Sequence, residues 1–428
     1  MLQEEILFKS AKIGIVGLGY VGLPFSFLCV EKGFEVIGFE INEKKINALK
    51  DGASYISEIS DKQVKLIMDT KRFNLSNNFC ILSVCDIILV CVPTPLAANG
   101  NPNYSYLFDS LEAIANTLRK GQLIIIESTL VPETTNKEII PILCKSGLEI
   151  GEDFYLAYSP ERIDPGNHIY QLQNIPKLVS GYSNKCAALA ELFYSQLSIE
   201  VFTVSSMAVA ELSKILENTY RDINIALINE MAQICYAHKI NIWEVIDAAS
   251  SKPFGFHPFY PGPGVGGHCI PKDSEFYSNW AKKVGKTATL CECARRINNT
   301  MPNYIITRLA ELLANDKKDI NGSQILVLGV TYKPDVNDLR ESPTIKILEL
   351  LLSMGAHLSI HDPYINQINV NNQLIESVDF NSIKNNKYDC IILAVAHSFY
   401  KDYKEFNASN IFDLTNTVDK TVRNLTVI

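Results

Sequence analysis

The feature that most constrains this chain is a glycine-rich turn between an expected strand and an expected helix. The turn, Gly17-Leu18-Gly19-Tyr20-Val21-Gly22, ends an apolar run at 12–17 and begins a helical pattern at 18–32. In this G-x-G-x-x-G spacing the first glycine makes a tight turn, the second lets backbone approach a pyrophosphate, and the third allows close helix–strand packing. The helix N-terminus then directs unpaired N–H groups at the phosphates. The sequence therefore predicts a dinucleotide site at Gly17, Gly19, Tyr20, Val21 and Gly22.

A carboxylate completes this motif. Glu40 ends the next expected strand, 35–40, roughly 20 residues beyond the glycines, where an acid binds ribose hydroxyls and repels a 2′-phosphate. NAD is therefore favoured over NADP, and the nearby Lys44 and Lys45 weaken this preference only slightly. FAD, or a glycine turn with a surface glutamate, are the alternatives that the motif leaves open.

Strand and helix patterns alternate along most of the chain. Further apolar runs typical of strands lie at 87–92, 123–128, 155–157 and 177–180. A second series of expected strands lies at 324–329, 357–361, 390–394 and 410–413, with a helix at 343–354. Such alternation predicts the α/β class, with two doubly wound, Rossmann-like parallel sheets.

A long helix is expected between these two series. Residues 207 to about 238 contain no glycine or proline and repeat apolar residues at helical spacing, with Ser205 or Ser206 as the expected N-cap. At about 1.5 Å per residue the helix would measure about 48 Å. It can join two domains and offer a dimer surface, or its apolar residues can be ordinary core. A Gly/Pro-rich loop at 253–271 and a second helical stretch at 290–313 follow.

Charge and hydropathy exclude several classes of protein. Lys and Arg total 39 against 47 Asp and Glu, a formal net charge of -8, which argues against a nucleic-acid binder. The first residues do not form the basic, apolar and small-residue succession of a signal peptide. The most apolar runs, 81–92 and 123–131, are interrupted by Asp86 and Glu127 and are too short to span a bilayer. We expect a cytoplasmic protein with no membrane or nucleic-acid partner.

The cysteines are consistent with a reducing compartment. None of the 11 cysteines has zinc-finger or paired C-x-x-C spacing. Four lie in apolar runs and are expected to be reduced core thiols, namely Cys29, Cys85, Cys91 and Cys390.

One cysteine has a different setting. Four glycines precede a single thiol in the segment Gly262-Pro263-Gly264-Val265-Gly266-Gly267-His268-Cys269, and Lys272 and Asp273 follow it. Glycines reach backbone conformations that other residues rarely adopt, so this loop can wrap around a ligand and expose Cys269. A thiolate can add to an aldehyde and form a thiohemiacetal, which hydride removal converts into a hydrolysable thioester. The loop therefore predicts a nucleophile; an incidental cysteine, or metal ligation by His268 and Cys269, are the alternatives.

Two polar residues on the expected long helix could assist such a reaction. Lys214 and Asn218 are four residues apart, so they share one helix face. Together they can donate hydrogen bonds to a developing oxyanion. A solvated polar face is the other interpretation.

With these motifs in place, the chain resembles the nucleotide-sugar 6-dehydrogenases of the UDP-glucose and UDP-mannosamine type over nearly its full length. The resemblance rests on eight segments: GLGYVGLP at 17–24, VPTPL at 92–96, ESTLVPETT at 127–135, SPERIDPGN at 159–167, ELSKILENTYRDINIALINE at 211–230, GPGVGGHCIPKD at 262–273, ARRIN at 294–298 and TYKPDVNDLRESP at 331–343.

The resemblance implies a role for each matching residue. Cys269 matches the nucleophile, Lys214 and Asn218 the oxyanion-stabilising pair, and Asp273 an acid that positions water or the lysine. Thr129 matches a threonine that orders water, and Glu161 an acid of thioester hydrolysis. The resemblance also implies ligand contacts by Pro93, Thr94 and Arg340 for the cofactor, and by Arg162, Gly266 and Lys333, together with Glu161, Lys214 and Asn218, for the substrate.

The resemblance further implies an organisation and a reaction. We expect an NAD-binding domain at 1–203, a central helical dimerisation region with the cysteine loop at 204–315, and a UDP-sugar-binding domain at 316–428. The expected reaction consumes two NAD and oxidises a sugar C6 alcohol to a carboxylate, without a metal. The expected assembly is a homodimer or a dimer-based oligomer.

The choice of sugar depends on finer features. The segments SPERIDPGN, IPKLVSG and PFGFHPFYPGPGVGGHC resemble the UDP-N-acetylglucosamine branch more than the UDP-glucose branch. UDP-glucose is the runner-up, and UDP-N-acetylmannosamine and UDP-N-acetylgalactosamine stay open. Two positions depart from many members, which carry Asp where this chain has Asn103 and Ala396, the latter before His397. A one-step β-hydroxyacid dehydrogenase and an NAD-sensing scaffold are the alternative classes, and neither would need Cys269.

Overall fold

The computed structural model describes residues 1–56, 59–97, 99–164, 166–167, 169–401 and 407–428, so Pro165 of the segment 159–167 lies outside the described residues. The chain forms two compact units, Met1–Glu217 and Asn218–Ile428, and the division falls inside one long helix. The three-domain division at 203 and 315 stays a prediction.

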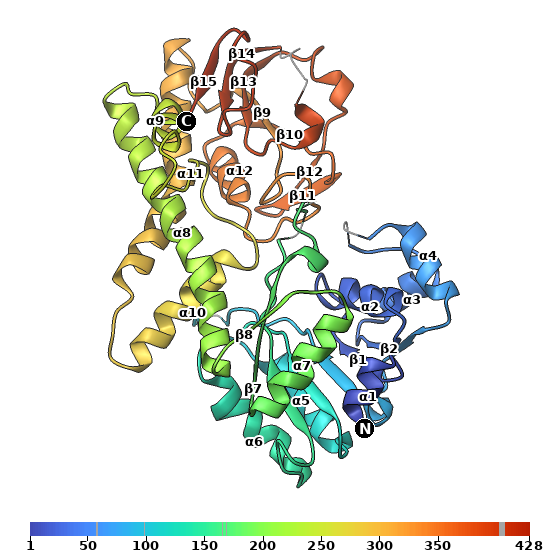
Figure 1. Ribbon diagram of the computed structural model, residues 1–428. Helices are drawn as coiled ribbons and strands as arrows, with labels where there is room; N and C mark the ends of the chain where they lie inside the picture. The colour runs from blue at the N-terminus through green and yellow to red at the C-terminus, as the bar shows by residue number, and fades with distance from the viewer. Residues whose placement is uncertain (57–58, 98, 165, 168, 402–406) are drawn as a thin grey trace. The chain divides into compact units, whose positions relative to one another are not determined.

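The first unit is built on an eight-stranded sheet of order β3-β2-β1-β4-β5-β6-β7-β8 (Figure 1). All neighbours are parallel except β6 and β7, which are antiparallel. The chain moves outward from β1 to β3 and returns to the other side of β1 for β4, which is the reversal of a doubly wound sheet. The strands are β1 Lys12–Val16, β2 Glu35–Phe39, β3 Phe73–Ser76, β4 Ile87–Val90, β5 Leu123–Ile126, β6 Tyr155–Tyr158, β7 Lys177–Gly181 and β8 Val201–Thr203.

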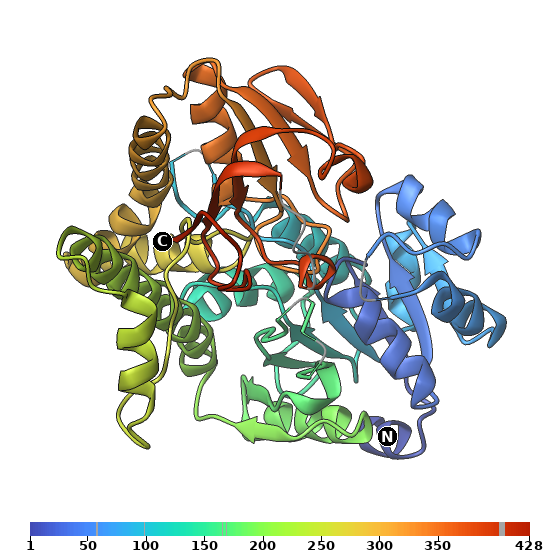
Figure 2. The same cartoon turned by 90° about the horizontal axis from the view of Figure 1, so that it is seen from above.

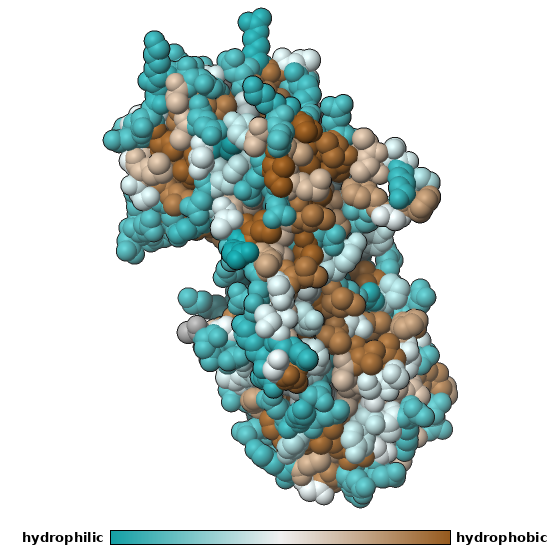
Figure 3. Space-filling model, turned by 90° about the vertical axis from the view of Figure 1, so that its left-hand side faces the viewer, coloured by the Kyte–Doolittle hydropathy of each residue, from teal (hydrophilic) through white to brown (hydrophobic). Residues whose placement is uncertain are grey.

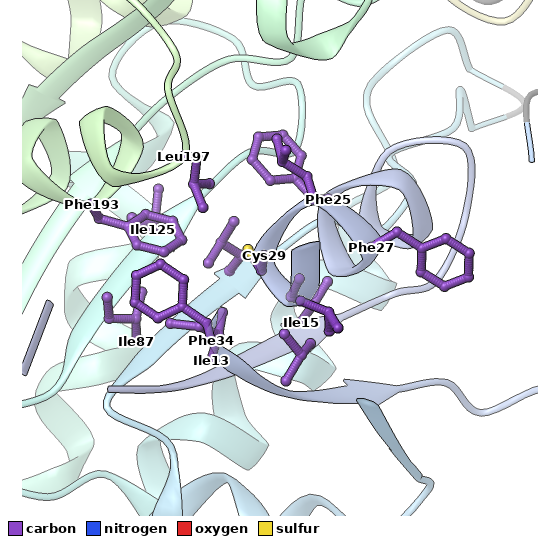
Figure 4. Packing of buried hydrophobic residues seen from close by; sticks show 14 of the residues in the cluster. Ile13, Ile15, Phe25, Phe27, Cys29, Phe34, Ile87, Ile125, Phe193 and Leu197 are labelled. Carbon is purple, nitrogen blue, oxygen red and sulfur yellow. The ribbon is translucent and has the colours of Figure 1, made fainter. Parts of the chain in front are cut away.

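Helices cover this sheet, because alternate strand residues are buried on both of its faces. On one face, Ile13, Ile87 and Ile125 pack with Phe25 of α2 and Phe193 of α7 (Figure 4). On the other face, the alternate strand residues, among them Ile88 and Ile124, are equally buried. The helices of the unit are α1 Leu2–Leu7, α2 Gly22–Glu31, α3 Glu43–Lys50, α4 Asp61–Asp69, α5 Ser105–Thr117, α6 Ile140–Leu143 and α7 Asn184–Gln196.

A single helix, α8 Met207–Ala237, crosses from the first unit into the second (Figure 1). Its 31 residues agree with the prediction of one helix from 207 to about 238. The Ser206 hydroxyl accepts a hydrogen bond from the N–H of Val209 at 3.3 Å, as expected for an N-cap.

The second unit contains a parallel sheet of order β10-β9-β13-β14-β15 (Figure 2, orange to red). The chain again leaves its first strand on one side and returns on the other, so the prediction of two doubly wound sheets is confirmed. The elements are α9 Ile242–Ser250, α10 Ile270–Lys283, α11 Thr289–Asn315, β9 Gln324–Leu328, α12 Pro343–Ser353, β10 His357–His361, the antiparallel pair β11 Gln367–Val370 and β12 Gln373–Glu376, β13 Tyr388–Leu393, β14 Ala408–Asp413 and β15 Leu425–Val427.

Two details differ from the sequence-based expectations. The helix after the glycine turn begins at Gly22 rather than at Leu18, because the turn itself occupies residues 17–21. Among the thiols expected in the core, Cys91 is only half-buried, because it begins the loop after β4. Within the described ranges, no helix combines the length and the apolar composition that crossing a membrane requires.

Candidate functional site

The glycine turn of the first unit fits a dinucleotide. Gly17 has φ +93°, and a Cβ there would lie 2.9 Å from the carbonyl oxygen of Cys91. A Cβ on Gly22 would overlap the carbonyl oxygen of Gly17, so only glycine lets α2 begin this close to β1. A Cβ on Gly19 would meet no heavy atom within 4 Å. The open space therefore lies at the position where the motif requires a pyrophosphate to approach.

Helix α2 begins directly after the turn. Its N-cap residue, Val21, makes no side-chain capping hydrogen bond, and Tyr20 and Val21 are half-buried in the turn that leads into the helix. The N–H groups of Leu23 and Phe25 already donate to the carbonyls of Gly19 and Val21, so the positive end of the helix dipole is what favours a bound anion here. The chemistry of the turn thus suits the diphosphate of NAD.

Glu40 lies directly after β2, as predicted, and it is nearly buried. Its Oε1 accepts the N–H groups of Ile41 and Asn42, both at 3.0 Å, and its Oε2 lies 3.1 Å from the ammonium of Lys45. Lys45 is therefore a partner of the acid and not a free cation available to a 2′-phosphate. Tyr55 closes the same corner by donating a hydrogen bond to the carbonyl of Leu18 at 2.5 Å.

The loops after β4 and β5 lie side by side. The Thr94 hydroxyl donates to the carbonyl of Thr129 at 3.1 Å, and the Ser128 hydroxyl donates to the carbonyl of Val92 at 2.7 Å. Pro93 is exposed and Thr129 is partly exposed. The carboxyl ends of neighbouring parallel strands carry ligand sites in doubly wound sheets, so the predicted Pro93, Thr94 and Thr129 meet at a suitable edge.

Glu161 belongs to a buried cluster of charges. Lys177 at the start of β7 forms ion pairs with Glu127 and, at 3.0 Å, with Glu161. The Tyr194 hydroxyl donates to the other oxygen of Glu127 at 2.5 Å. Glu161 also accepts the N–H groups of Arg162 and Ile163, each at 2.5 Å.

The two carboxyl groups of this cluster differ in acidity. Burial raises the pKa of Glu127 to about 7, against the lowering effect of Lys177. Burial also acts to raise the pKa of Glu161, but the Lys177 ammonium, the Ile163 N–H and the charge of Lys214 together hold it below its ordinary value. Burial would lower the pKa of Lys177, yet the two carboxylates raise it. Near neutral pH, Glu161 is therefore ionised, while Glu127 can bind a proton.

Hydrogen bonds and an ion pair connect the start of α8 to loops of the first unit. Glu211 accepts the N–H groups of Glu133 at 2.7 Å and Thr135 at 2.9 Å. Arg162 pairs with Glu217 at 2.7 Å and donates to the carbonyl of Pro176 at 2.8 Å. Lys214 lies between these two anchors and is buried.

In the second unit, Cys269 is exposed and immediately precedes α10. Its carbonyl accepts the N–H of Asp273 at 2.9 Å, and Asp273 Oδ2 accepts the Asn218 side-chain amide at 2.5 Å. Asp273 is fully buried, and its Oδ1 has no hydrogen-bond partner among the described residues. The structure therefore brings together three residues that the sequence predicted to be catalytic, and it leaves one carboxylate oxygen free to accept a proton donor.

The glycines before Cys269 allow close packing on the segment 331–343. A Cβ on Gly266 would overlap the carbonyl oxygen of Glu341, and one on Gly267, which has φ +85°, would lie 2.7 Å from the Tyr332 ring. The N–H of Gly267 also donates to the carbonyl of Arg340 at 3.1 Å. The backbone of the cysteine loop is thus held against the segment that carries Lys333 and Arg340.

The cations of this segment and the neighbouring histidine have partners of different kinds. The Arg340 guanidinium binds the carboxylate of Asp338, with the shortest contact at 2.6 Å, and the Lys333 ammonium lies 5.9 Å from the centre of the Tyr332 ring. Burial, with Lys272 and Arg340 nearby, lowers the pKa of His268 to about 4. His268 is therefore neutral at pH 7. No group of three His, Cys, Asp or Glu side chains in the described part of the chain has the arrangement of a metal site.

One of the two departing positions, Asn103, has a hydrogen-bond partner, and so does His397, which follows the other, Ala396. Asn103 Oδ1 accepts the N–H of Ser105, the first residue of α5, at 3.0 Å, which an aspartate would do equally well. His397 is buried, with Nε2 3.0 Å from Asp362 Oδ2, and its Nδ1 accepts the N–H of Asp335 at 2.9 Å.

Sequence reasoning missed Glu127 and Lys177 as site residues. Glu127 was considered only as an interruption of an apolar run, although a carboxylate inside an expected core strand requires a buried partner. Lys177 begins another such strand and supplies that partner. The signal was present in both runs, but the sequence could not show that β5 and β7 bring their ends together.

Each unit thus gathers a part of the predicted site. The first contains the glycine turn, Glu40, the Pro93, Thr94 and Thr129 edge, Glu161 and Lys214; the second contains Asn218, Cys269, Asp273, Gly266, Lys333 and Arg340. Lys214 and Asn218 lie one turn apart on α8, which carries them across the division.

Comparisons with known proteins find similar proteins along most of the chain. Models of the UDP-glucose/GDP-mannose dehydrogenase family match residues 11–198 as the NAD-binding domain, 208–300 as the central domain and 326–420 as the UDP-binding domain. A UDP-N-acetyl-D-glucosamine 6-dehydrogenase of Salmonella typhi is 34% identical over 92% of this chain and 91% of its own length. A UDP-N-acetyl-D-mannosamine dehydrogenase of Methanococcus maripaludis is 35% identical over 94% of this chain and 90% of its own.

A solved structure gives the same result for the fold. The UDP-D-ManNAc dehydrogenase of Pyrococcus horikoshii superimposes with a TM-score of 0.87 and 31% identity, covering 97% of this chain and 98% of the other. By its sequence, its fold and its three matched domains, this chain is an enzyme of the UDP-glucose/GDP-mannose dehydrogenase family, with the NAD-binding domain of that family.

Proposed function

We propose that the enzyme oxidises UDP-N-acetylglucosamine at C6 in two successive steps and releases the corresponding uronic acid. The observation that carries the proposal is the exposed Cys269, joined through its own carbonyl to Asp273 and through Asp273 to Asn218. An exposed thiol held in this way suits a covalent intermediate, which the second oxidation of an aldehyde needs.

The chemistry divides into three steps. NAD, held by the turn 17–22 and Glu40, would supply the hydride acceptor for both oxidations, so two NAD and one water would be consumed for each sugar. The Cys269 sulfur adds to the aldehyde carbon, and loss of a second hydride from that carbon leaves a thioester. Attack by water breaks the C–S bond, releases the carboxylate and returns the electron pair to sulfur.

The chain's own residues position these steps. Lys214 and Asn218 project from one face of α8 and stabilise negative charge on the reacting oxygen. Asp273, with its free Oδ1, accepts a proton or holds the lysine. Thr129 orders water, Glu161 activates it, and Arg162 and Gly266 contact the sugar nucleotide. Lys333 binds the UDP moiety and Arg340 lies near the cofactor.

The choice of sugar is tested by a direct comparison. Relatives of similar identity are named for UDP-N-acetyl-D-glucosamine and for UDP-N-acetyl-D-mannosamine, and both substrates carry a 2-acetamido group. We expect kcat/KM to be highest for UDP-N-acetylglucosamine among this sugar, its manno and galacto isomers, and UDP-glucose. Two NADH should form per sugar consumed. A preference for UDP-glucose would refute the assignment of the sugar, and one NADH per sugar would refute the four-electron scheme.

The assembly proposed with this function is a homodimer. The spacing of five exposed apolar residues places them in a stripe on one face of α8. The stripe consists of Val209, Leu216, Tyr220, Leu227 and Ile234. Figure 3 shows the side on which α8 lies in Figure 1, with hydrophobic residues gathered in patches along it. A second copy that packs its own α8 against this stripe would bury the stripe symmetrically.

The dimer is tested in solution. Light scattering should give twice the chain mass, and Leu227→Glu should shift the protein toward the monomer. The control is Arg221→Glu, which changes an exposed residue of α8 away from the stripe. A wild type that is monomeric at micromolar concentration would refute the dimer.

A further inference from the structure

The geometry points to Lys177 as a positioning residue for thioester hydrolysis. Its ammonium lies between the carboxylates of Glu127 and Glu161, and it keeps the Glu161 carboxylate ionised and fixed in orientation. This inference rests on the proposed function, because it assigns a device to one step of it. Lys177 does not touch the substrate in this scheme, and it acts only through Glu161.

The three charged side chains of the cluster are exposed to solvent to different degrees. The side chains of Glu127 and Lys177 are 0% and 3% exposed, whereas that of Glu161 is 12% exposed. Only Glu161 can therefore present an oxygen outward. The cluster extends from the interior, where Tyr194 and Glu127 lie, through Lys177 to this single outer carboxylate.

Stability alone does not explain such a cluster. Each buried ion costs several kcal/mol in desolvation, and well-packed apolar residues of the same volume are often equally stable. Here two carboxylates share one ammonium, so the cluster carries one excess negative charge whenever both acids are ionised. That excess makes it a site at which one proton is taken up or released near neutral pH.

The contacts of the two acids determine which of them is ionised. Both oxygens of Glu161 are engaged by donors that favour its charged form, with Oε1 bound by the N–H groups of Arg162 and Ile163 and Oε2 bound by Lys177. Glu127 is enclosed more deeply, and burial raises its pKa, whereas the pKa of Glu161 is lowered. The charged and titratable groups around Glu161 are Lys177 on β7, Glu127 after β5, the Cys91 thiol after β4, Lys214 on α8 and Arg162 beside it.

The different ionisation of Glu161 and Glu127 determines which of them takes up a proton during hydrolysis. The attacking water gives one proton to Glu161 as its oxygen bonds to the thioester carbon. The C–S bond then breaks, and its electron pair stays on the Cys269 sulfur. Glu161 needs to be ionised before each turnover, and Lys177 secures that state, while Glu127 holds the compensating proton away from the reaction.

The experiment compares Lys177→Met with Lys177→Met/Glu127→Gln. The single variant buries two carboxylates without a counter-charge and can fail to fold; the double variant removes one charge of each sign and keeps the volumes close. Lys177→Arg retains the ammonium's charge and is the conservative rescue. Lys120→Met removes an exposed lysine of the same unit and is the control.

Single-turnover kinetics with UDP-N-acetylglucosamine provide the readout. The double variant should form two NADH per Cys269 at a rate near that of the wild type and then accumulate a thioester, visible in the intact mass of the protein. Its hydrolysis should be about 10²-fold slower, the scale of one lost acid–base contribution. The acid limb of its hydrolysis rate should move to higher pH, because loss of the Lys177 ammonium raises the pKa of Glu161.

A double-mutant cycle with Glu161→Gln separates this role from a structural one. If Lys177 acts through Glu161, adding Glu161→Gln to the double variant should slow hydrolysis no further than Glu161→Gln alone. Additive losses, or a folded double variant that hydrolyses at the wild-type rate, would overturn the inference. A wild type that reduces no NAD with any of the four UDP-sugars would instead refute the proposed function itself.

Discussion

The two glycine-rich loops of this enzyme have similar compositions and opposite uses. In the turn 17–22, Gly17 and Gly22 pack against backbone carbonyls, but the central Gly19 keeps space open, since a Cβ on it would meet nothing within 4 Å. In the loop 262–267, the chain itself fills the space nearest to Cys269, with the carbonyl of Glu341 and the ring of Tyr332 directly against Gly266 and Gly267. The turn 17–22 thus has room for a ligand, whereas the loop 262–267 packs against other parts of the chain and positions the Cys269 side chain.

The buried polar contacts of the two units are more alike. In the first unit, Lys177 lies between two carboxylates. The second unit joins α8 to α11 through both amides and charges, since Asn229 binds Asn298 at 3.0 Å and the buried Asp222 pairs with Arg295 at 2.9 Å. The contrast between the two loops teaches that a glycine-rich stretch has no single meaning. Its use depends on whether ligand or protein atoms occupy the space that the missing side chains leave.

The largest expected effect comes from replacing Cys269, which the second loop positions. Cys269→Ser should reduce uronic acid production by at least about 10³-fold, since a hydroxyl is a far poorer nucleophile near neutral pH. NAD binding, measured by fluorescence titration, should be unchanged, because the turn 17–22 is untouched. Cys144→Ser, another exposed thiol, is the control. A variant that still produces acid at the wild-type rate would remove Cys269 from its role.

The next effect separates two glycines of the first loop. Gly22→Ala should destabilise the protein by about 1–3 kcal/mol, because its Cβ meets the backbone carbonyl of Gly17 and neither backbone can yield cheaply. Gly19→Ala should leave the melting temperature within a degree or two and weaken NAD binding about tenfold, because its Cβ enters the space meant for the pyrophosphate. Equal losses of stability in both variants would contradict the distinction.

A smaller effect is expected at the second loop. Gly266→Ala pushes against the carbonyl of Glu341 and should lower kcat about tenfold by displacing Cys269, without changing the affinity for NAD. Gly262→Ala is the matched control, because a Cβ there meets nothing within 4 Å. If kcat fell equally in both, the packing on 331–343 would not be what positions the thiol.

Much of this architecture could be predicted from the sequence, because its strongest signals are local. Strand β1, the turn 17–22 and α8 follow from short-range patterns, and each agrees with the structure to within a few residues. Strands β3 and β8 could not be predicted in this way, since Phe73–Ser76 has only four residues and Val201–Thr203 only three, and most of their side chains are not buried. They become strands only because a neighbouring strand offers them hydrogen bonds.

The candidate site was less predictable than the fold, because its contacts connect distant residues. The bond from Asn218 to Asp273 spans 55 positions, and the pair of Lys177 and Glu127 spans 50. No local spacing marks either pair. Motif resemblance named Asn218 and Asp273, but it gave no role to Lys177, whose importance becomes visible only when its burial and its two partners are known.

The smallest expected effect tests the charged interior of the first unit through pH. Burial raises the pKa of Glu127 from 4.5 to about 7. The folded protein therefore binds this proton more tightly than the unfolded chain, and the stability that this gives is present at low pH and is lost as pH rises through 7. Glu127→Gln cannot titrate, so its stability relative to the wild type should improve by about 1 kcal/mol from pH 6 to pH 8 in urea unfolding. The control is Glu112→Gln, which removes a carboxyl group from an exposed ion pair of the same unit. A pH-independent difference between Glu127→Gln and the wild type would mean that Glu127 exchanges no proton between these pH values.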